Sequence, residues 1–485
     1  MNLYENLVNY VKSDYYPFHM PGHKRREFLD LHSPYGYDIT EIEGFDNLHE
    51  AEGILARSME EAARIYHTQA TYYLINGSTS GLLAAISAVT DPGDEILMAR
   101  NCHKAVYNAV FLRGLIPNYL YPPIIGEYNI AGSIDVSDVE QVFMSKHKSK
   151  GKIAAVVITS PTYDGVVSNI KEIAELVHAH DSILIVDEAH GAHFPFSSQF
   201  PISAIECGAD IVIQSIHKTL PALTQTALLH QNSLRVDPKR LKKYLSIYQS
   251  SSPSYILMSS IERCLKFVSS SNESFGQYLT LLHEFYESTS DLNILKVWRP
   301  IQGINIYDKD NSKLIIGANN SEVSGIWIYN QLLNTYHIQA EMVMKDYVVC
   351  LSSVCDTKEG FQRLANALHQ MDQQITSLKT FDMTKSEQSI RLQNAKMPSS
   401  EMVILPSKVD EYEHESKPLN DCEGEIAAEY IYLYPPGIPI VVPGERLSQS
   451  FLQQLRNYKL AGLSLRGMAD HTGAYLDVLG RRKRD

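Results

Sequence analysis

Two ionisable side chains stand just beyond apolar runs in the sequence. Asp187 directly follows the run Ile183–Val186, and Lys218 belongs to a Ser-Ile-His-Lys segment that begins directly after Ile211–Gln214. A lysine that burial makes less basic can attack a carbonyl carbon and form an imine. A carboxylate at the end of a buried strand needs a cationic partner, because an isolated buried charge is very costly. The two residues, 31 positions apart, therefore predict imine chemistry at Lys218, assisted by a carboxylate.

The sequence is compatible with two partners for the Asp187 carboxylate. A metal ion is one of them, with His190 and His193 as further ligands, because imidazole and carboxylate groups commonly bind metals. The spacing of these three residues matches no recognisable closed metal site. The other partner is a protonated ring nitrogen of an organic cofactor. We favour the ring nitrogen and expect no metal.

A run of glycine and hydroxyl residues, Gly77–Gly81, lies between the apolar run Tyr72–Ile75 and a helical stretch. The first turn of a helix offers unpaired backbone N–H groups and the positive end of the helix dipole, which together bind phosphate. Ser78 and Thr79 are the candidate ligands. The run superficially resembles the Gly-x-Ser-x-Gly elbow of hydrolases, but its central residue is Thr79, so a hydrolase serine is not supported. A simple helix cap is the alternative.

A ring that could stack on a planar ligand completes the set. His103 follows the apolar run Glu95–Met98, although a histidine in such a place often has only a structural role. Each of these features is weak by itself, and a single lysine after a strand usually has no chemical role. Together, a phosphate turn, a stacking ring, a strand-end aspartate and an imine-forming lysine predict a site for pyridoxal phosphate.

The apolar runs that end at these residues, and a further run at Ile153–Thr159, are short, rich in β-branched side chains and separated by helical stretches such as 51–67 and 168–180. This pattern predicts an α/β fold with a mostly parallel sheet covered on both faces. Ligands bind beyond the carboxyl ends of such strands, where the candidate residues lie. The expected division is an irregular N-terminal arm (1–50), a cofactor-binding domain (51–260), a small α+β domain (261–375), a linker (376–400) and a C-terminal domain (401–485).

The composition is that of an acidic globular protein. The 485 residues contain 43 basic and 56 acidic side chains, a formal charge of −13, so attraction to nucleic acid or to an anionic membrane is not expected. The first residues include Glu5, Lys12 and Asp14 and resemble no signal peptide, and no apolar run reaches the ~18 residues of a membrane helix. The six cysteines are dispersed, which favours free thiols and a cytoplasmic protein.

Several longer motifs are spread along the chain: PFHMPGHK, GSTSG, RNCHKAV, SPTYDGVVSNI, VDEAHGAH, SIHK followed by TQTA, and YPPGIPIVVPGE. Together they resemble the ornithine/lysine/arginine decarboxylases, which are fold type I pyridoxal phosphate enzymes. The resemblance extends from about residue 17 to about residue 450. The chain is similar to the short, Gram-positive-type members of this family, which do not have the wing domain that precedes PGHK in the long enzymes. The resemblance implies an aspartate aminotransferase-like large domain, a small α+β domain, a C-terminal α+β domain, and a homodimer or larger homo-oligomer.

The resemblance implies a role for each residue that faces the cofactor ring. Lys218 would form the Schiff base, and Asp187 would pair with the pyridine nitrogen. His103 would stack on the ring. His190 would lie near the ring oxygen, and His217 near the reacting carbon.

The resemblance also implies the contacts of the cofactor phosphate. After the lysine, the family favours small residues, often glycine, whereas this chain has Thr219–Ala222. The implied phosphate ligands are Ser78, Thr79 and Ser215 and, toward the partner subunit's phosphate, Ser250, Ser251 and Ser252.

The implied reaction is decarboxylation of arginine, lysine or ornithine to agmatine, cadaverine or putrescine in polyamine metabolism, with arginine slightly favoured. Fold type I aminotransferases usually clamp the substrate α-carboxylate with an arginine, and the matching segment Tyr347–Ser352 has none. A decarboxylase gains from leaving that carboxylate unstabilised. An aminotransferase or lyase of the same fold is the alternative. A silent regulatory partner and a metal-dependent hydrolase are disfavoured, because Lys218, Asp187 and His103 are all present.

Acidic residues gather toward the end of the chain, where residues 401–450 hold ten acidic and three basic side chains. A solvated acidic surface is one explanation, and an electrostatic funnel for a basic substrate is the other. The distal cation of such a substrate needs an acidic or polar pocket. We favour Glu429, which lies in a compact Ala-Ala-Glu segment flanked by apolar residues. The other candidates are Glu425 and, in the arm, Glu41, Glu43 and Asp46.

Overall fold

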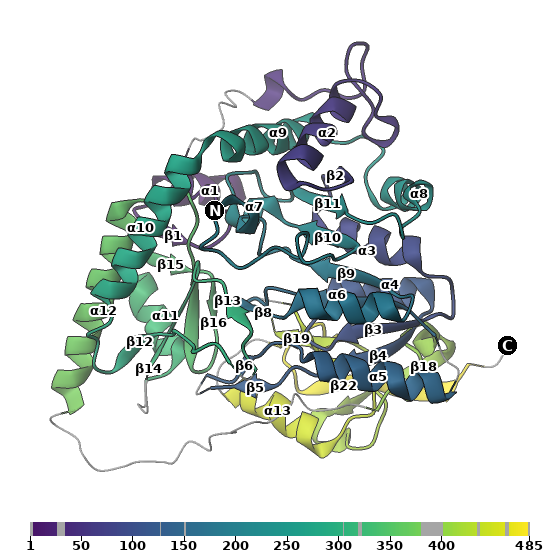
Figure 1. Ribbon diagram of the computed structural model, residues 1–485. Coiled ribbons are helices and arrows are strands. Elements are labelled where there is room, and N and C mark those ends of the chain that lie inside the picture. The colour runs from purple at the N-terminus through teal and green to yellow at the C-terminus, as the bar shows by residue number, and fades with distance from the viewer. Residues whose placement is uncertain are drawn as a thin grey trace.

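The structure is a computed structural model, drawn as a ribbon in Figure 1. A central sheet with helices on both faces forms the body, and a smaller sheet with long helices lies beside it. The residues that the structure describes are 3–26, 34–126, 128–149, 152–303, 305–318, 323–379, 401–433, 437–460 and 465–483.

The central sheet has seven strands in the order β2 (Ala70–Leu74), β11 (Ala227–Gln231), β10 (Ile211–Gln214), β9 (Ile183–Asp187), β7 (Ile153–Thr159), β3 (Glu95–Ala99) and β4 (Ile116–Leu120). From β10 to β4 the strands are parallel, whereas β11 is antiparallel to both of its neighbours. Their side chains are largely buried, as the continuous apolar runs predict. The predicted α/β fold with a mostly parallel sheet is confirmed.

Helices cover both faces of this sheet, with α5 and α6 on one face and α3 and α4 on the other (Figure 1). The close approach of α3 depends on Gly81, because a Cβ at that position would lie 2.5 Å from Cδ1 of Leu74. The helices are α2 (Ile54–Tyr66), α3 (Gly77–Val89), α4 (Lys104–Arg113), α5 (Val136–Ser149), α6 (Ile170–Ala179), α8 (Pro238–Tyr248) and α9 (Tyr255–Ser270).

Strand β11 is not among the predicted runs. The segment that joins it to β10 contains only the short helix α7 (Ile216–Thr219). A parallel crossover needs about a dozen residues or more, usually including a helix that spans the sheet. The four residues of α7 cannot span it, so the chain turns back and pairs antiparallel.

The connection from β9 to β10 lacks the helical stretch that is expected between the apolar runs. Residues 188–210 contain the 3-10 turn η3 (Phe194–Phe196) and no α-helix. Pro195 and Pro201 explain the difference, because proline has no backbone N–H to donate within a helix.

The N-terminal arm is more regular than predicted. It contains the helix α1 (Leu3–Lys12), in which Leu3, Leu7 and Val11 recur at the spacing of one helical face. The strand β1 (Tyr16–Phe18) then pairs in parallel with β15 (Ile338–Ala340) of the small domain. The arm is thereby attached to the small domain by a two-stranded sheet.

The small domain is built on an antiparallel sheet of β12 (Leu295–Val297), β14 (Lys313–Ala318), β17 (Tyr347–Leu351) and β16 (Met342–Val343). Its helices are α10 (Asn272–Ser288), α11 (Gly325–Asn334) and α12 (Lys358–Lys379). The expected boundary at residue 260 falls inside α9, and the expected linker start at 376 falls inside α12. The rest of that linker, 380–400, lies outside the described residues.

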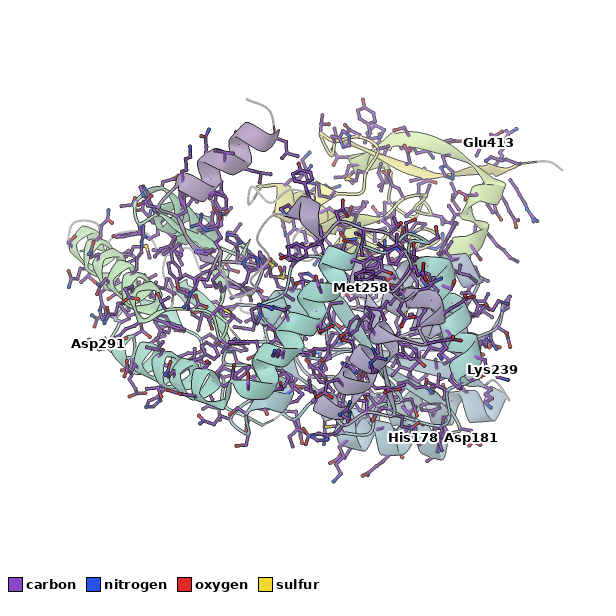
Figure 2. The ribbon with its side chains drawn as sticks, turned by 90° about the horizontal axis from the view of Figure 1, so that it is seen from above. His178, Asp181, Lys239, Met258, Asp291 and Glu413 are labelled. Carbon is purple, nitrogen blue, oxygen red and sulfur yellow. The ribbon has the colours of Figure 1, made fainter. Side chains whose placement is uncertain are left out.

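The C-terminal unit has its own apolar cluster, which includes Leu419, Ile431, Leu455 and Val478. Its elements are η4 (Pro406–Glu411), β18 (Tyr412–Pro418), β19 (Ile431–Leu433), β20 (Pro439–Val441), α13 (Gln449–Leu460), β21 (Leu465–Arg466) and β22 (Tyr475–Arg482). Figure 2 shows Glu413 at the outer edge of this unit, far from Asp291 of the small domain.

A buried ion pair fastens the C-terminal unit to the cofactor domain. Arg100, which follows β3, places Nη2 3.2 Å from Oε2 of Glu445, and both side chains are almost fully buried. Arg100 also donates to the backbone oxygens of Pro439 and Ile440 at 2.6 and 2.9 Å. These bonds fix the C-terminal unit against Arg100, which precedes His103 by three residues.

All six cysteines are free in the structure, as predicted. Among the helices of the described ranges, none has the length and apolar character of a membrane span.

Candidate active site

Lys218 lies on α7 at the carboxyl end of the central sheet. Its Nζ is 3.0 Å from Nε2 of His190. Burial lowers the pKa of the Lys218 amine, and the nearby charge of Lys313 lowers it further, whereas Asp187 and Glu341 raise it. A lysine with a lowered pKa is a better nucleophile near neutral pH.

Asp187 is the last residue of β9, and its side chain is buried. Its Oδ1 accepts a hydrogen bond from the backbone N–H of Ala189 at 3.2 Å. Burial raises the pKa of Asp187, and the positive charge of Lys218 lowers it. The tertiary structure thus brings these two residues within electrostatic reach of each other, as the alignment of parallel strands predicts.

Two histidines lie beside this pair in neutral form. His103 precedes α4 and accepts the N–H of Ala105 on Nδ1 at 3.2 Å, and burial lowers the pKa of His103 to about 4. Burial also lowers the pKa of His217 to about 4. The Nδ1 of His217 lies 2.7 Å from the backbone oxygen of Thr226 and therefore donates to it. A neutral ring at His103 has an uncharged face for stacking.

His190 and His193 point to different partners. His190 faces Lys218 through Nε2, while Nε2 of His193 is 3.3 Å from Oδ1 of Asp310. Within the described ranges, no cluster of three or more His, Cys, Asp or Glu side chains is arranged as metal ligands.

Two buried hydroxyl groups near Lys218 could accept a phosphate as their partner. Oγ of Ser215 and Oγ1 of Thr219 are buried, with no hydrogen-bond partner among the described residues. Ser78 and Thr79 lie in the first turn of α3, which no side chain caps. Gln225 links the start of α3 to the lysine loop. Its Nε2 donates to the backbone oxygen of Ile75 at 2.7 Å, and the backbone oxygen of the next residue, Thr226, accepts Nδ1 of His217. Hydroxyl groups and free N–H groups suit a phosphate, so the residues present fit the cofactor.

The predicted contact to a partner subunit's phosphate lies on an exposed loop. The backbone N–H of Ser250 donates to Oδ1 of Asn76 at 3.0 Å, which places the loop beside the first turn of α3 in the same chain. Ser251 and Ser252 are exposed there.

Three of the five acidic candidates for the substrate's distal cation already have partners. Glu429 accepts the backbone N–H groups of Ala469 and Asp477 at 2.7 and 3.0 Å, and burial raises the pKa of Glu429. Glu425 is 2.7 Å from Nζ of Lys417. Asp46 accepts four backbone N–H groups near the start of α2. Glu41 and Glu43 are exposed.

The PGHK segment of the arm holds the loop that carries Lys218. The N–H of Gly22 donates to the backbone oxygen of His217 at 2.7 Å, and Oγ of Ser353 donates to the oxygen of Gly22 at 2.5 Å. A Cβ on Gly22 would lie 2.8 Å from the backbone of Thr219 and Leu220. The loop that departs from the family pattern is thus closely packed, and Gly22 is the residue that permits the contact.

We expect Gly22→Ala to displace the lysine loop. Backbone atoms at 2.8 Å cannot yield as a flexible side chain does, so overpacking should cost about 1–3 kcal/mol of unfolding free energy. Chemical denaturation measures this cost, and cofactor absorbance reports the loop. Gly36→Ala is the matched control in the arm, because a Cβ at Gly36 meets no atom within 4 Å. Equal stability of the two variants would contradict the packing argument.

Three residues close to Lys218 were not predicted to have a chemical role. Glu341, Tyr163 and Lys313 surround the Lys218–His190 pair, and all three lie on segments whose structure was predicted without a chemical role. A signal was present for Glu341, since it is an acid within the otherwise uncharged run 338–343.

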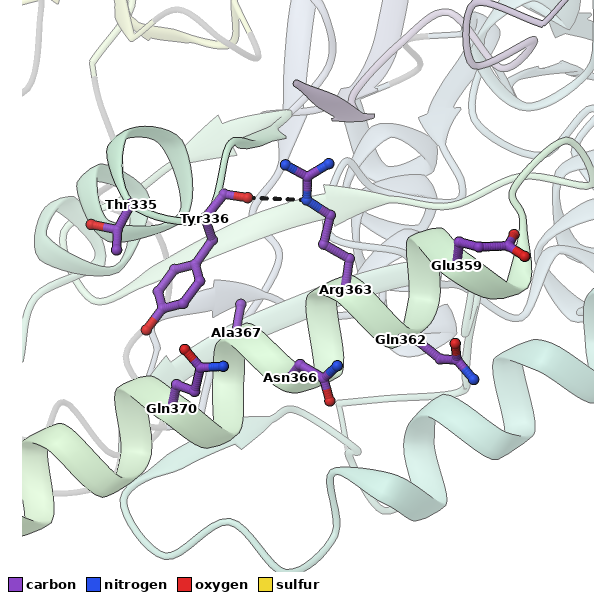
Figure 3. Close-up of a pocket in the computed structure, with 8 residues that line it drawn as sticks. All are labelled: Thr335, Tyr336, Glu359, Gln362, Arg363, Asn366, Ala367 and Gln370. Atoms are coloured by element: carbon purple, nitrogen blue, oxygen red, sulfur yellow. Dashed lines mark hydrogen bonds between the residues drawn. The ribbon is translucent and has the colours of Figure 1, made fainter. Parts of the chain in front are cut away.

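A polar hollow of about 460 Å³ lies on the small domain, beyond the end of α11 and along α12 (Figure 3). Nε of Arg363 donates to the backbone oxygen of Tyr336 at its wall, 3.1 Å away. None of its lining residues belongs to the site around Lys218.

The fold and this site define a fold type I pyridoxal phosphate enzyme. The crystal structure of the Francisella novicida lysine decarboxylase LdcF superposes with a TM-score of 0.78 and 19% identity, covering 98% of this chain and 80% of that chain. The arginine decarboxylase of Halalkalibacterium halodurans is 30% identical, over 98% of this chain and 97% of its own. The arginine decarboxylase of Bacillus subtilis is 29% identical, over 99% and 98%.

The family models agree with these relatives. The major domain of the Orn/Lys/Arg decarboxylases matches residues 1–344, and their C-terminal domain matches residues 390–472. The chain belongs to the Orn/Lys/Arg decarboxylase family and is an amino-acid decarboxylase that depends on pyridoxal 5'-phosphate.

Proposed function

We propose that the enzyme decarboxylates arginine to agmatine and contributes to polyamine metabolism. The observation that carries this proposal is its similarity to two arginine decarboxylases along nearly the whole chain. Lysine, giving cadaverine, and ornithine, giving putrescine, are the other substrates that the family includes. An aminotransferase activity is disfavoured, because β17, where such enzymes usually carry a carboxylate-binding arginine, contains none.

In this proposal each residue near Lys218 has one task. Lys218 would hold the cofactor covalently, and Asp187 would keep the ring nitrogen protonated. When bound, the cofactor would supply a ring that accepts the electron pair left on the substrate carbon as CO2 departs. His103 stacks on the ring. His190, at 3.0 Å from the lysine amine, orients it next to the ring oxygen.

The proton that replaces CO2 on the substrate comes from Lys218 or from His217. The ring of His217 is neutral, and its Nδ1 proton is engaged by the oxygen of Thr226. This leaves Nε2 as an acceptor. We therefore favour Lys218 as the donor.

The phosphate is proposed to bind at the first turn of α3 and at the unpaired hydroxyl of Ser215. The exposed loop with Ser251 and Ser252 would reach the phosphate of a second subunit, so the proposed enzyme is a homodimer or a larger homo-oligomer. We place it in the cytoplasm, on the strength of its six free thiols.

For the distal cation we retain Glu429 as the proposed ligand. Its two bonds to backbone N–H groups leave carboxylate lone pairs for a guanidinium. An unchanged KM in Glu429→Gln would count against it, and Glu425 or Asp46 would then be tested in the same way.

The test of the proposed function is to identify the product. Purified enzyme with pyridoxal phosphate is incubated separately with arginine, lysine and ornithine, and released CO2 and amine are measured. We expect agmatine from arginine at the highest kcat/KM. A keto acid without CO2 would show an aminotransferase, and cadaverine or putrescine as the main product would reassign the substrate.

A further inference from the structure

Glu341 is a carboxylate that none of these tasks uses. It lies at the one-residue break between β15 and β16. Its Oε2 accepts the backbone N–H of Met20 at 2.8 Å, and its Oε1 accepts the hydroxyl of Tyr163. The arm, the segment after β7 and the small domain therefore meet at this carboxylate, and two donors fix its position.

Tyr163 connects this carboxylate to the lysine. Its ring packs edge-on against the ring of His190, with centroids 4.7 Å apart and planes at 63°. His190 in turn lies 3.0 Å from Nζ of Lys218. Glu341 is thus held just behind the residues that touch the lysine amine, and its charge favours the protonated amine.

The other charges around Lys218 are already matched. Lys313 is 3.2 Å from Asp310, and both side chains are fully buried. Asp187 is assigned to the ring nitrogen in the proposed function. The nearby histidines are neutral, because burial lowers the pKa of each. The titratable groups that act on Lys218 are Asp187, His103, His190, His217, Lys313 and Glu341.

We propose that Glu341 is a positioning residue: through Tyr163 and Met20 it is fixed where its negative charge stabilises positive charge on the Lys218 nitrogen. The inference rests on the proposed function of Lys218. It gives the small domain and the arm a direct part in the chemistry, because the carboxylate comes from one and its backbone donor from the other.

The test is an absorbance titration of the enzyme with pyridoxal phosphate bound, from acid to alkaline pH, without substrate. The visible absorbance follows the protonation of the nitrogen that joins Lys218 to the cofactor. Removal of a negative charge makes the protonated form less stable, so its pKa falls. We expect the midpoint in Glu341→Gln to move to lower pH by about one unit. In Glu341→Asp, which keeps the negative charge, the midpoint should return most of the way to the wild-type value.

Tyr163→Phe removes one of the two donors that fix the carboxylate and keeps its charge. We expect a smaller shift in the same direction, and this variant decides the matter if Glu341→Gln does not fold. The matched control is Glu359→Gln, an exposed acid on α12 of the same domain, which should leave the midpoint unchanged.

An unchanged midpoint in both Glu341→Gln and Tyr163→Phe overturns the inference. A higher KM for the amino acid with an unchanged midpoint also overturns it, since the carboxylate would then act on the substrate. Failure of the proposed function looks different. The wild-type enzyme itself would lack the lysine-dependent absorbance, and Lys218→Ala would change nothing.

Discussion

Replacement of Lys218 by alanine is expected to lower the rate of CO2 release by a factor of at least about 1,000. The amine of Lys218 is placed 3.0 Å from His190 and within electrostatic reach of Asp187, at the carboxyl end of the sheet. No other lysine of the described residues interacts with both of these groups. The visible absorbance of the bound cofactor should disappear together with the activity.

Lys218→Arg separates the covalent task from the charge. Arginine keeps a positive charge near Asp187 and His190 but forms no imine under ordinary conditions. We expect this variant to fold with near-normal stability and to remain inactive, as measured by thermal unfolding and CO2 release. Substantial activity in either variant would show that Lys218 does not hold the cofactor.

Replacement of Asp187 by alanine or asparagine is expected to lower the rate by about 100-fold or more. A buried carboxylate can raise the pKa of a cationic partner by about 1–3 units, and the loss of that charge leaves the ring nitrogen unprotonated at neutral pH. Because asparagine has nearly the size of aspartate, the loss in Asp187→Asn isolates the charge from the packing. Single-turnover CO2 release measures the loss of the chemical step.

The titration of Asp187 should also be visible in the pH dependence of the wild-type enzyme. Burial raises the pKa of Asp187, although the charge of Lys218 opposes the shift. The residue therefore becomes protonated at a higher pH than an ordinary aspartate as the pH falls. This shift belongs to the cofactor-free enzyme, since a ring cation beside Asp187 would oppose it. We therefore expect an acid limb in the affinity of the cofactor-free enzyme for pyridoxal phosphate that is absent in Asp187→Asn.

Asp210 supplies the control for this experiment. It is also a buried aspartate, but it precedes β10 at the opposite end of the sheet, where it binds the N–H of Leu184 at 2.8 Å and His178 at 2.9 Å. Asp210→Asn should lose stability and retain the acid limb. A loss of activity in Asp210→Asn equal to that in Asp187→Asn would mean that burial, and not position, explains the effect.

Much of the sheet could be predicted because the signal is local. The run Ile153–Thr159 coincides with β7, and Ile211–Gln214 coincides with β10. Asp187 and Lys218 could be paired as candidates because parallel strands bring their carboxyl ends to one edge. This inference needs the order of the segments along the chain and no knowledge of side-chain contacts.

The irregular parts could not be predicted in the same way. Strand β11 is a short apolar segment that follows the lysine loop, and its direction depends on the length of the connection more than on its own residues. The helix α1 is a different case, because Leu3, Leu7 and Val11 recur at a helical spacing and the signal was therefore present in the sequence. For Glu429 the apolar flanks were visible in the sequence, but its two backbone donors, from Ala469 and Asp477, were not.

By itself, the sequence determined the class of fold, the cofactor and the residues at the strand ends, because periodicity and motif order are properties of the chain. Only the tertiary structure decided which residues support them. Gly22 meets Leu220, and Met20 meets Glu341, across long stretches of sequence. Such contacts follow from the way the arm, the small domain and the central sheet pack together. They leave no regular pattern in the sequence, because each depends on a single close approach between segments that are distant in the sequence.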